Sequence, residues 1–335
     1  MTSSAEGAPA AVPAVAAAAP RIPDFFIVGH AKTGTTALYQ MLRRHPEIFM
    51  PELKEPLYFA TDLRMRFQRP SAGALPTQLE DYLALFAGAA PGQLAGEASS
   101  SYLWSHDAAR LIAALQPKAK IIAILREPAA FVRSLHLQLL QNHIESEKDL
   151  RKALALEPAR REGKRIPRRS TRPQALFYSE RVKYVEQLRR YEALFAPEQM
   201  LVLIYDDFRH HNEATVRRVL RFLEVDDTVA IETAEANPTV LMRSQQLDEL
   251  VHRFSVGRGP FSRAVKHAVK SLVPPRLRRE ALQRAQQQVV LGPAPPADAA
   301  LLGELRRRYR EEVVALSEHL GRDLVAEWGY DDGAV

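Results

Sequence analysis

The feature that most constrains the fold is a short apolar run that leads through a loop of small and hydroxyl residues into a helical pattern. Residues 25–28 are Phe-Phe-Ile-Val and end at Gly29, which is typical of a strand buried in a parallel sheet. The loop Gly29-His30-Ala31-Lys32-Thr33-Gly34-Thr35-Thr36 follows. Beyond it, apolar residues recur at helical spacing until Pro46, which predicts a helix over 35–45.

The same alternation recurs along the chain. Apolar runs predict strands over 93–97, 121–125 and 200–205, and amphipathic patterns predict helices over 107–115, from Pro128, over 177–195 and over 301–320. Asn212 is the expected N-cap of one more helix. Strands that alternate with helices form parallel sheets covered by helices. We therefore expect an α/β, P-loop-like three-layer fold with a central parallel sheet flanked by helices, in a single domain over residues 23–330.

Composition narrows the classes of function. The chain has no cysteine, which excludes disulfides, thiolate metal sites and cysteine nucleophiles and is compatible with a reducing cytosol. Its 46 Lys and Arg against 40 Asp and Glu leave a net charge of only +6, mixed along the chain, so a local anion pocket is favoured over a nucleic-acid-binding surface. No apolar run is long enough to predict a transmembrane segment.

Three segments fall outside the regular pattern. Residues 1–22 are rich in Ala and Pro and predict a disordered tail, and a signal peptide is disfavoured because no basic residues precede the weakly hydrophobic run. Residues 160–172 carry seven Arg and Lys and predict a mobile basic loop, which either attracts an anionic acceptor, closes over a nucleotide or is simply solvated. Residues 243–296 predict an irregular basic segment.

The loop at 29–36 has the context of a phosphate-binding loop, because it joins a strand to the N-terminus of a helix. Gly29 and Gly34 have the spacing of a Walker A motif, but Thr35 stands where its lysine belongs, and Lys32 precedes Gly34 by two residues. The strand over 121–125 ends in Arg126 rather than in an acidic metal ligand. These departures argue against a kinase or NTPase and favour phosphate binding without a metal.

Four segments in order resemble the sulfotransferases that use 3′-phosphoadenosine 5′-phosphosulfate (PAPS). Residues 32–38 (KTGTTAL) resemble the family's 5′-phosphosulfate loop, and Arg126 with Ser134 resembles its 3′-phosphate signature. Residues 54–59 (KEPLYF) and 96–99 (GEAS) resemble two further segments. The similarity is to the bacterial carbohydrate and heparan sulfate types. It implies a nucleotide-binding enzyme that transfers the sulfuryl group to a hydroxyl or amine and releases 3′-phosphoadenosine 5′-phosphate (PAP).

The resemblance also implies roles for individual residues. Lys32 would stabilise charge on the leaving oxygen, and Glu55 would be the general base. The loop residues Thr33, Gly34, Thr35 and Thr36 would hold the 5′-phosphate together with Lys32, although Thr35 also fits a helix cap. Arg126 and Ser134 would bind the 3′-phosphate. A small molecule, a glycan or a lipid would be the acceptor, and the cytoplasm the expected location.

Several alternatives stay open at this level. Glu97 is an alternative base or a positioning partner, and Ala98 stands where the heparan sulfate type has a lysine. His136 fits core or surface better than catalysis, the pair at 210–211 fits a solvated turn, and no metal site is expected. Arg258 could cover the 3′-phosphate. A protein that binds PAP without catalysis is the remaining alternative to an enzyme.

Overall fold

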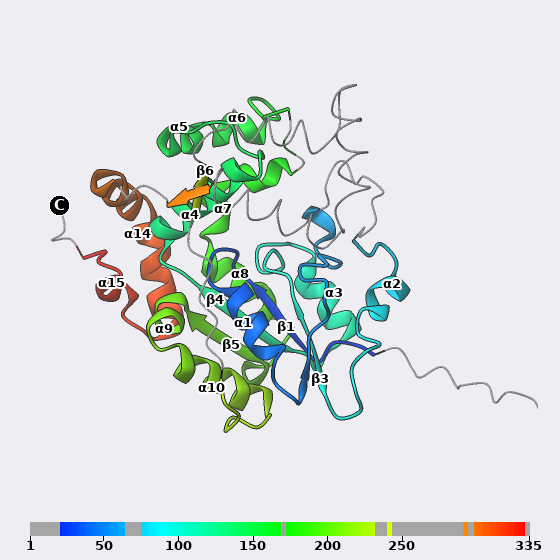
Figure 1. Ribbon diagram of the computed structural model, residues 1–335. Coiled ribbons are helices and arrows are strands. Elements are labelled where there is room, and N and C mark those ends of the chain that lie inside the picture. The colour runs from blue at the N-terminus through cyan, green and yellow to red at the C-terminus, as the bar shows by residue number, and fades with distance from the viewer. Residues whose placement is uncertain are drawn as a thin grey trace, which may run out of the picture.

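A computed structural model describes residues 21–63, 75–168, 170, 172–231, 240–242, 291–293 and 298–331. Its centre is a five-stranded sheet in the order β2-β3-β1-β4-β5 (Figure 1), in which all neighbouring strands are parallel. The strands are β1 (Phe25–Gly29), β2 (Ile48–Phe49), β3 (Leu94–Ala98), β4 (Lys120–Leu125) and β5 (Met200–Ile204). The predicted α/β fold with a parallel central sheet is confirmed.

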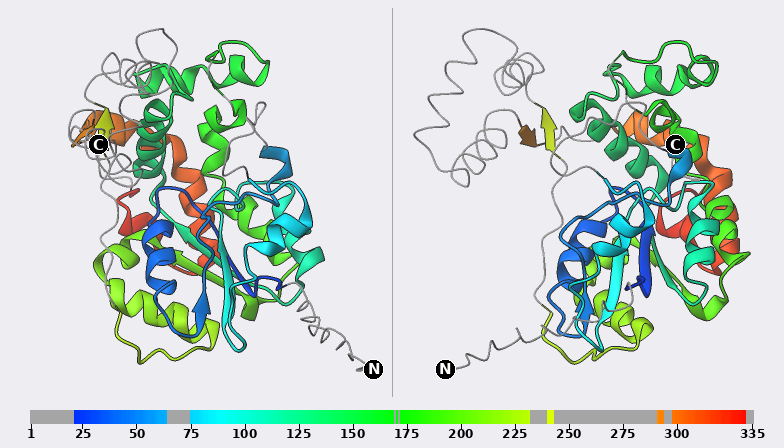
Figure 2. Two further views of the ribbon diagram at one scale, coloured as in Figure 1. Left: turned by 45° about the vertical axis from the view of Figure 1, so that its right-hand side comes forward. Right: turned by 90° about the vertical axis from the view of Figure 1, so that its right-hand side faces the viewer.

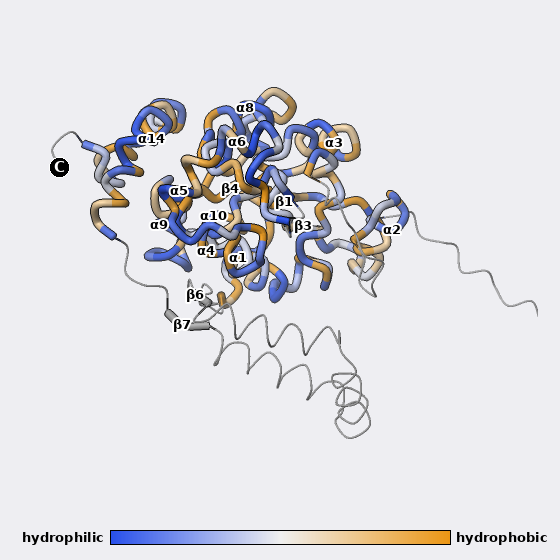
Figure 3. The backbone as a smooth tube through the Cα atoms, turned by 90° about the horizontal axis from the view of Figure 1, so that it is seen from above, coloured by the Kyte–Doolittle hydropathy of each residue, from blue (hydrophilic) through white to orange (hydrophobic). Residues whose placement is uncertain are grey.

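The sheet is apolar on both faces because successive strand residues point to opposite sides. Phe26 and Val28 belong to one core with alternate residues of β4, whereas Phe25 and Ile27 belong to a second core on the other face. Figure 2 shows α1 and α14 on opposite sides of the sheet. In Figure 3, hydrophilic stretches lie on outer helices such as α8. The continuous apolar runs in the sequence therefore reflect burial on two faces.

Helices cover each face. The face of Phe25 is covered by α1 (Thr35–Leu42), α9 (Tyr205–His210) and α10 (Asn212–Leu223). The opposite face is covered by α2 (Leu79–Ala84), α3 (Ala108–Leu115), α8 (Tyr184–Glu192), the C-terminal half of α14 (Ala299–Leu320) and α15 (Leu324–Glu327). None of the helices in the described ranges is both long and apolar enough to cross a bilayer.

A third core lies beyond the sheet. It joins α4 (Pro128–Gln141), α5 (Leu150–Ala155), α7 (Tyr178–Arg181) and the N-terminal half of α14, and α6 (Glu157–Arg161) lies next to α5. Short 3₁₀ turns occupy Thr61–Leu63, Pro173–Leu176 and Pro197–Gln199. Strands β6 (Val240–Met242) and β7 (Leu291–Pro293) pair with each other in antiparallel fashion.

Several predicted boundaries differ from the structure. The first helix ends at Leu42 rather than at 45. The helix predicted over 177–195 is two helices, α7 and α8, because Tyr178 and Val182 pack in the third core while Tyr184 and Leu188 pack against the sheet. Asn212 is the first residue of α10 instead of its N-cap. Apolar spacing persists across such a break, so periodicity alone does not reveal it.

The described residues begin two positions before the predicted start of the domain. Arg21 and Ile22, assigned to the tail, are described, and the Arg21 guanidinium pairs with Asp24 at 2.6 Å and donates to the Gln93 carbonyl at 2.7 Å. These contacts tie the residues before β1 to the start of β3. Residues 1–20 lie outside the described residues, as do Arg258 and the segment 243–296 apart from β7.

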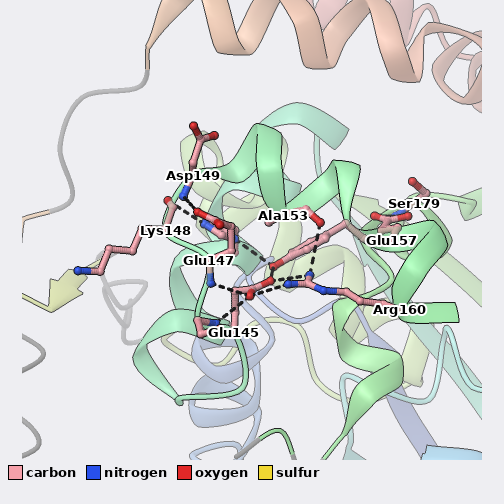
Figure 4. Close-up of polar contacts among 11 residues, drawn as sticks. Glu145, Glu147, Lys148, Asp149, Ala153, Glu157, Arg160 and Ser179 are labelled. Carbon is pink, nitrogen blue, oxygen red and sulfur yellow. Dashed lines mark hydrogen bonds and ion pairs between the residues drawn. The ribbon is translucent and has the colours of Figure 1, made fainter. Parts of the chain in front are cut away.

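The basic segment 160–172 is not uniformly a solvated loop. Arg160 belongs to α6, and its side chain is 1% exposed in an ion pair with the completely buried Glu145 (Figure 4). The pair is bidentate, with N–O distances of 2.7 and 2.8 Å. Tyr178 also donates to Glu145, at 3.0 Å. The prediction is therefore wrong for Arg160, because long-range pairing with Glu145 provides the compensation that a buried guanidinium needs.

Candidate active site

The carboxyl ends of four parallel strands bring the candidate residues to one edge of the sheet. Loops after β1, β3 and β4 supply Lys32, Ser100 and Arg126. The first residue of α9, directly after β5, supplies Tyr205, and the segment before the 3₁₀ turn at 61–63 supplies Glu55. These side chains share one cavity. Its full lining is Ala31, Lys32, Gly34, Thr35, Thr36, Ala37, Glu55, Ser100, Arg126, Gln138 and Tyr205.

The loop between β1 and α1 is tightly braced. Gly34 has a φ of +85°, and a Cβ at this position would lie 2.7 Å from a ring carbon of Phe208, so only glycine fits. Thr33 is completely buried, and its hydroxyl donates to the His30 carbonyl at 2.6 Å. The hydroxyl of Thr33 therefore braces the loop and does not line the cavity, in contrast to its predicted role as a phosphate ligand. Thr35 and Thr36 do line the cavity.

His30 lies in this loop but is turned into the protein. Its Nε2 is 2.6 Å from Oε1 of Gln187, and its ring packs against Phe131 with centroids 5.1 Å apart. Burial and the nearby charge of Arg181 lower the pKa of His30 to about 3. The imidazole is therefore neutral at physiological pH and lines no part of the cavity.

Lys32 and Arg126 form the cationic part of the cavity. Arg126 donates from Nη1 to the main-chain carbonyl of Lys32 at 3.0 Å, and its guanidinium lies 4.6 Å from the centroid of the Tyr205 ring. Burial, and then the charge of Arg126, lower the pKa of the Lys32 ammonium. Two cations held this close repel each other unless an anion lies between or beside them, which is the arrangement expected of a phosphate site.

The main chain around Arg126 is held from two sides. Tyr184 donates its hydroxyl to the Arg126 carbonyl at 2.9 Å. The next residue, Glu127, caps α4 by accepting from the amides of Ala129 and Ala130, and it accepts the Tyr330 hydroxyl at 2.6 Å. Contacts from α8 and from the C-terminal part of the chain therefore hold the main chain at residues 126 and 127.

Ser134 lies on the same helix but is not part of the cavity wall. Its side chain is 2% exposed, and its Oγ makes no hydrogen bond with any residue that the structure describes. Gln138, one turn further along α4, does line the cavity. The structure thus brings Arg126 to the loop of Lys32 and leaves Ser134 as a buried, unpaired hydroxyl behind it.

Glu55 is fixed at the cavity by three donors. Its carboxylate accepts from Lys54 Nζ at 2.7 Å, from the Ser100 amide at 2.9 Å and from the Ser100 hydroxyl at 2.7 Å. The Glu55 amide donates to the carbonyl of Ala98 at the end of β3, at 3.1 Å. The residue has a φ of +61°, a conformation that non-glycine residues adopt rarely. The Glu55 side chain is 31% exposed and lines the cavity, so it remains accessible to a ligand.

Glu97 is separated from the cavity. It is completely buried in the core opposite α1 and accepts a hydrogen bond from the Tyr82 hydroxyl at 3.2 Å. Burial raises its pKa to about 7, although hydrogen bonds from Ser99 and Tyr102 oppose the shift. The alternative in which Glu97 is the base is not supported, because its side chain does not line the cavity.

Glu97 makes the stability of the protein depend on pH. Between pH 4.5 and about 7 the folded chain retains a proton on Glu97 that the unfolded chain has lost, so the free energy of unfolding should fall as pH rises through this window and level off above it. The Glu97→Gln variant should lack this contribution. Urea unfolding at pH 5 and pH 8 should show a larger decrease for the wild type than for Glu97→Gln; equal decreases would contradict the assignment.

Sequence reasoning missed three residues that line the cavity: Ser100, Gln138 and Tyr205. Each follows or lies close to a recognised motif, but only the tertiary fold shows which way it points.

Other expectations concerned histidines and a metal site. His136 is 2% exposed and contacts the Tyr178 hydroxyl at 3.0 Å, while residues 210 and 211 are exposed. In the described ranges, no three His, Asp or Glu side chains gather as a metal site would require.

Comparisons with known proteins agree with this geometry. The chain is 33% identical over 152 residues to carbohydrate sulfotransferase 15 of Mus musculus, covering 35% of this chain and 27% of the relative. It is 31% identical over 122 residues to heparan sulfate glucosamine 3-O-sulfotransferase 6 of Mus musculus, covering 36% and 31%. The chain thus spans about a quarter to a third of the length of these curated relatives.

The fold has a solved counterpart. The crystal structure of a sulfotransferase from Alicyclobacillus acidocaldarius aligns with a TM-score of 0.63 and 24% identity, over 92% of this chain and 99% of that one. The profile of the sulfotransferase family matches residues 23–228, which include every strand of the central sheet and the whole cavity. The chain belongs to the sulfotransferase family.

Proposed function

We propose that the protein transfers the sulfuryl group of PAPS to an acceptor hydroxyl or amine and releases PAP. The observation that carries this proposal is that two cationic side chains, Lys32 and Arg126, line one cavity. Arg126 donates to the main-chain carbonyl of Lys32 at 3.0 Å. The loop N–H groups and the N-terminus of α1 add donors for a phosphate. Thr35 stands where a Walker A motif has its lysine, and Arg126 follows β4 where a kinase or NTPase has an acidic metal ligand.

The chemistry requires little covalent work from the protein. The acceptor oxygen attacks sulfur, the bond from sulfur to the bridging oxygen breaks, and that oxygen stays on PAP with its electron pair. Lys32, in the loop that would hold the 5′-phosphate, would stabilise the charge that develops on this oxygen, which is effective because the ammonium is already partly desolvated. Thr35, Thr36 and Gly34 would hold the 5′-phosphate.

Glu55 would accept the proton of the acceptor hydroxyl. The carboxylate faces the cavity of Lys32, and Lys54 and Ser100 fix its orientation. A positioned base of this kind contributes about 10²- to 10⁴-fold to a rate. Its donors leave part of the carboxylate exposed, which is the access that a proton transfer needs.

Arg126 and Ser134 would bind the 3′-phosphate of the nucleotide. Ser134 lies behind the cavity wall, and its assignment rests on its buried hydroxyl, which has no partner among the described residues although a buried polar group normally has one. No metal is required by these residues. The names of the curated relatives make a carbohydrate one acceptor class to include, and the lack of cysteine supports the cytoplasm as the location.

Nucleotide binding tests the proposal directly. PAP at 100 times its dissociation constant should stabilise the native protein by about 2.7 kcal/mol, and ADP at the same concentration, with or without magnesium, should stabilise it much less. The measurement is the unfolding midpoint by differential scanning fluorimetry. Arg126→Ala should lose most of the PAP shift. The control Lys118→Ala changes an exposed lysine just before β4, at the opposite end of the strands from the cavity, and should keep the shift. A larger shift with magnesium and ADP than with PAP would contradict the proposal.

A further inference from the structure

A second cavity adjoins the first along the same two segments of chain. Pro56 and Leu57 directly follow Glu55, and Ser101 directly follows Ser100, so the same two segments of chain contribute to the walls of both cavities. Most of the wall is apolar. The complete lining is Pro56, Leu57, Tyr58, Ala60, Leu63, Leu75, Pro76, Thr77, Ser101 and Arg172.

The apolar wall is held in place by contacts behind it. The Tyr58 ring stacks on Tyr82 with centroids 4.7 Å apart and an interplanar angle of 17°, and Phe59 meets Tyr58 edge to face. The Leu57 amide donates to Ser99 Oγ at 3.1 Å, which anchors the segment to the end of β3. A wall fixed in this way costs little ordering on binding, so it suits an aromatic ring or an alkyl chain.

One charged side chain, Arg172, lines this mostly apolar cavity. Among the residues that the structure describes, the Arg172 guanidinium has no partner in a hydrogen bond or an ion pair, and its Nε is buried. Burial lowers the pKa of Arg172, and the charge of Glu55 opposes this. A half-buried guanidinium without a partner is costly unless an anion is provided.

The surrounding charges do not provide that anion. Arg181, 4% exposed, is near enough to Arg172 that the two repel, and its guanidinium lies 4.2 Å from the ring centroid of Trp104. Glu55 attracts both arginines, but its carboxylate already accepts from Lys54 and Ser100. Lys54, Arg172 and Arg181 are therefore all attracted to the single carboxylate of Glu55. The positive charge of Arg172 remains available to a ligand.

We propose that the second cavity is the acceptor site and that it selects an amphiphilic acid, with an apolar body on the Tyr58 wall, an anionic group at Arg172 and its hydroxyl at Glu55. This inference rests on the proposed function, because it places the acceptor hydroxyl at Glu55, the proposed general base. The order of the groups follows from the lining: Glu55 lines the first cavity and directly precedes Pro56 and Leu57 of the second, whereas Arg172 lines the second cavity only. A neutral sugar would leave Arg172 unpaired and the apolar wall poorly covered.

Pairs of acids and neutral amides test the charge requirement. We would titrate 4-hydroxyphenylacetate, 4-hydroxycinnamate and 12-hydroxydodecanoate, each with its amide, into the protein by calorimetry, with and without saturating PAP. At least one acid should bind about tenfold more tightly than its amide, as expected of a charge-assisted pair. Arg172→Leu should abolish this preference and leave the affinity for PAP unchanged within twofold, and Arg172→Lys should retain part of it.

The exposed Arg168 of the same segment offers a matched control, and Arg168→Leu should bind both members of a pair as the wild type does. The inference is overturned if no acid binds better than its amide, if the preference survives in Arg172→Leu, or if Arg172→Leu weakens PAP instead of the acid. Failure of PAP to bind would refute the proposed function, whereas PAP binding without an acid preference would refute this inference alone.

Discussion

Lys32→Ala should lower the turnover number for PAP formation from PAPS at least about a thousandfold, which corresponds to about 4 kcal/mol of lost transition-state stabilisation. The affinity for PAP should fall much less, because the ammonium contributes most when charge develops on the leaving oxygen. The measurement is single-turnover PAP release, with the acids above as acceptors and with water alone. The variant should fold normally, since Lys32 lies at the cavity rather than in a core.

Two companion variants sharpen this result. Lys118→Ala, an exposed lysine before β4, removes the same charge and should retain full turnover. Glu55→Gln should lose transfer to an acceptor while keeping PAP affinity, because Glu55 would contact the acceptor and not the nucleotide. If Lys32→Ala lost affinity and turnover by equal factors, Lys32 would bind phosphate without acting on the leaving group. If it bound PAP and kept full turnover, the catalytic role would be refuted.

Glu145→Leu should destabilise the fold by about 3–5 kcal/mol, the largest effect on stability that we expect of a single substitution. The variant leaves the guanidinium of Arg160 buried without its carboxylate, and Tyr178 loses its acceptor. The loss reflects an uncompensated buried charge more than the net value of the pair. It would be measured as the free energy of unfolding in urea, followed by tryptophan fluorescence.

The double variant Glu145→Leu/Arg160→Leu separates these two causes. It should recover much of the lost stability, because both charges are then absent from the interior. The exposed pair of Glu213 with Arg217, also separated by 2.7 Å, is the control, and Glu213→Leu should cost only about 0.3–0.5 kcal/mol. A double variant as unstable as Glu145→Leu would mean that packing rather than charge dominates.

Local signals predicted the scaffold of the site well. The strand, loop and helix around Lys32 are contiguous in sequence, and an apolar run, a glycine requirement and a helical period each report on a few neighbouring residues. The position of Arg126 at a strand end was readable for the same reason. The expected helix over 177–195 failed where two helices pack against different cores, which spacing along one chain does not record.

The sequence by itself determined the parallel α/β architecture, the phosphate-type loop and the family, because all of these depend on residues close together in the chain. Only the tertiary structure distinguished Glu55, which faces the cavity, from Glu97, which is buried in a core. It also turned Thr33 inward, paired Arg160 with Glu145 and placed Arg172 in the second cavity without a partner among the described residues. Burial and charge pairing depend on segments distant in sequence, so a side chain's role at this site is decided by what the fold places opposite it.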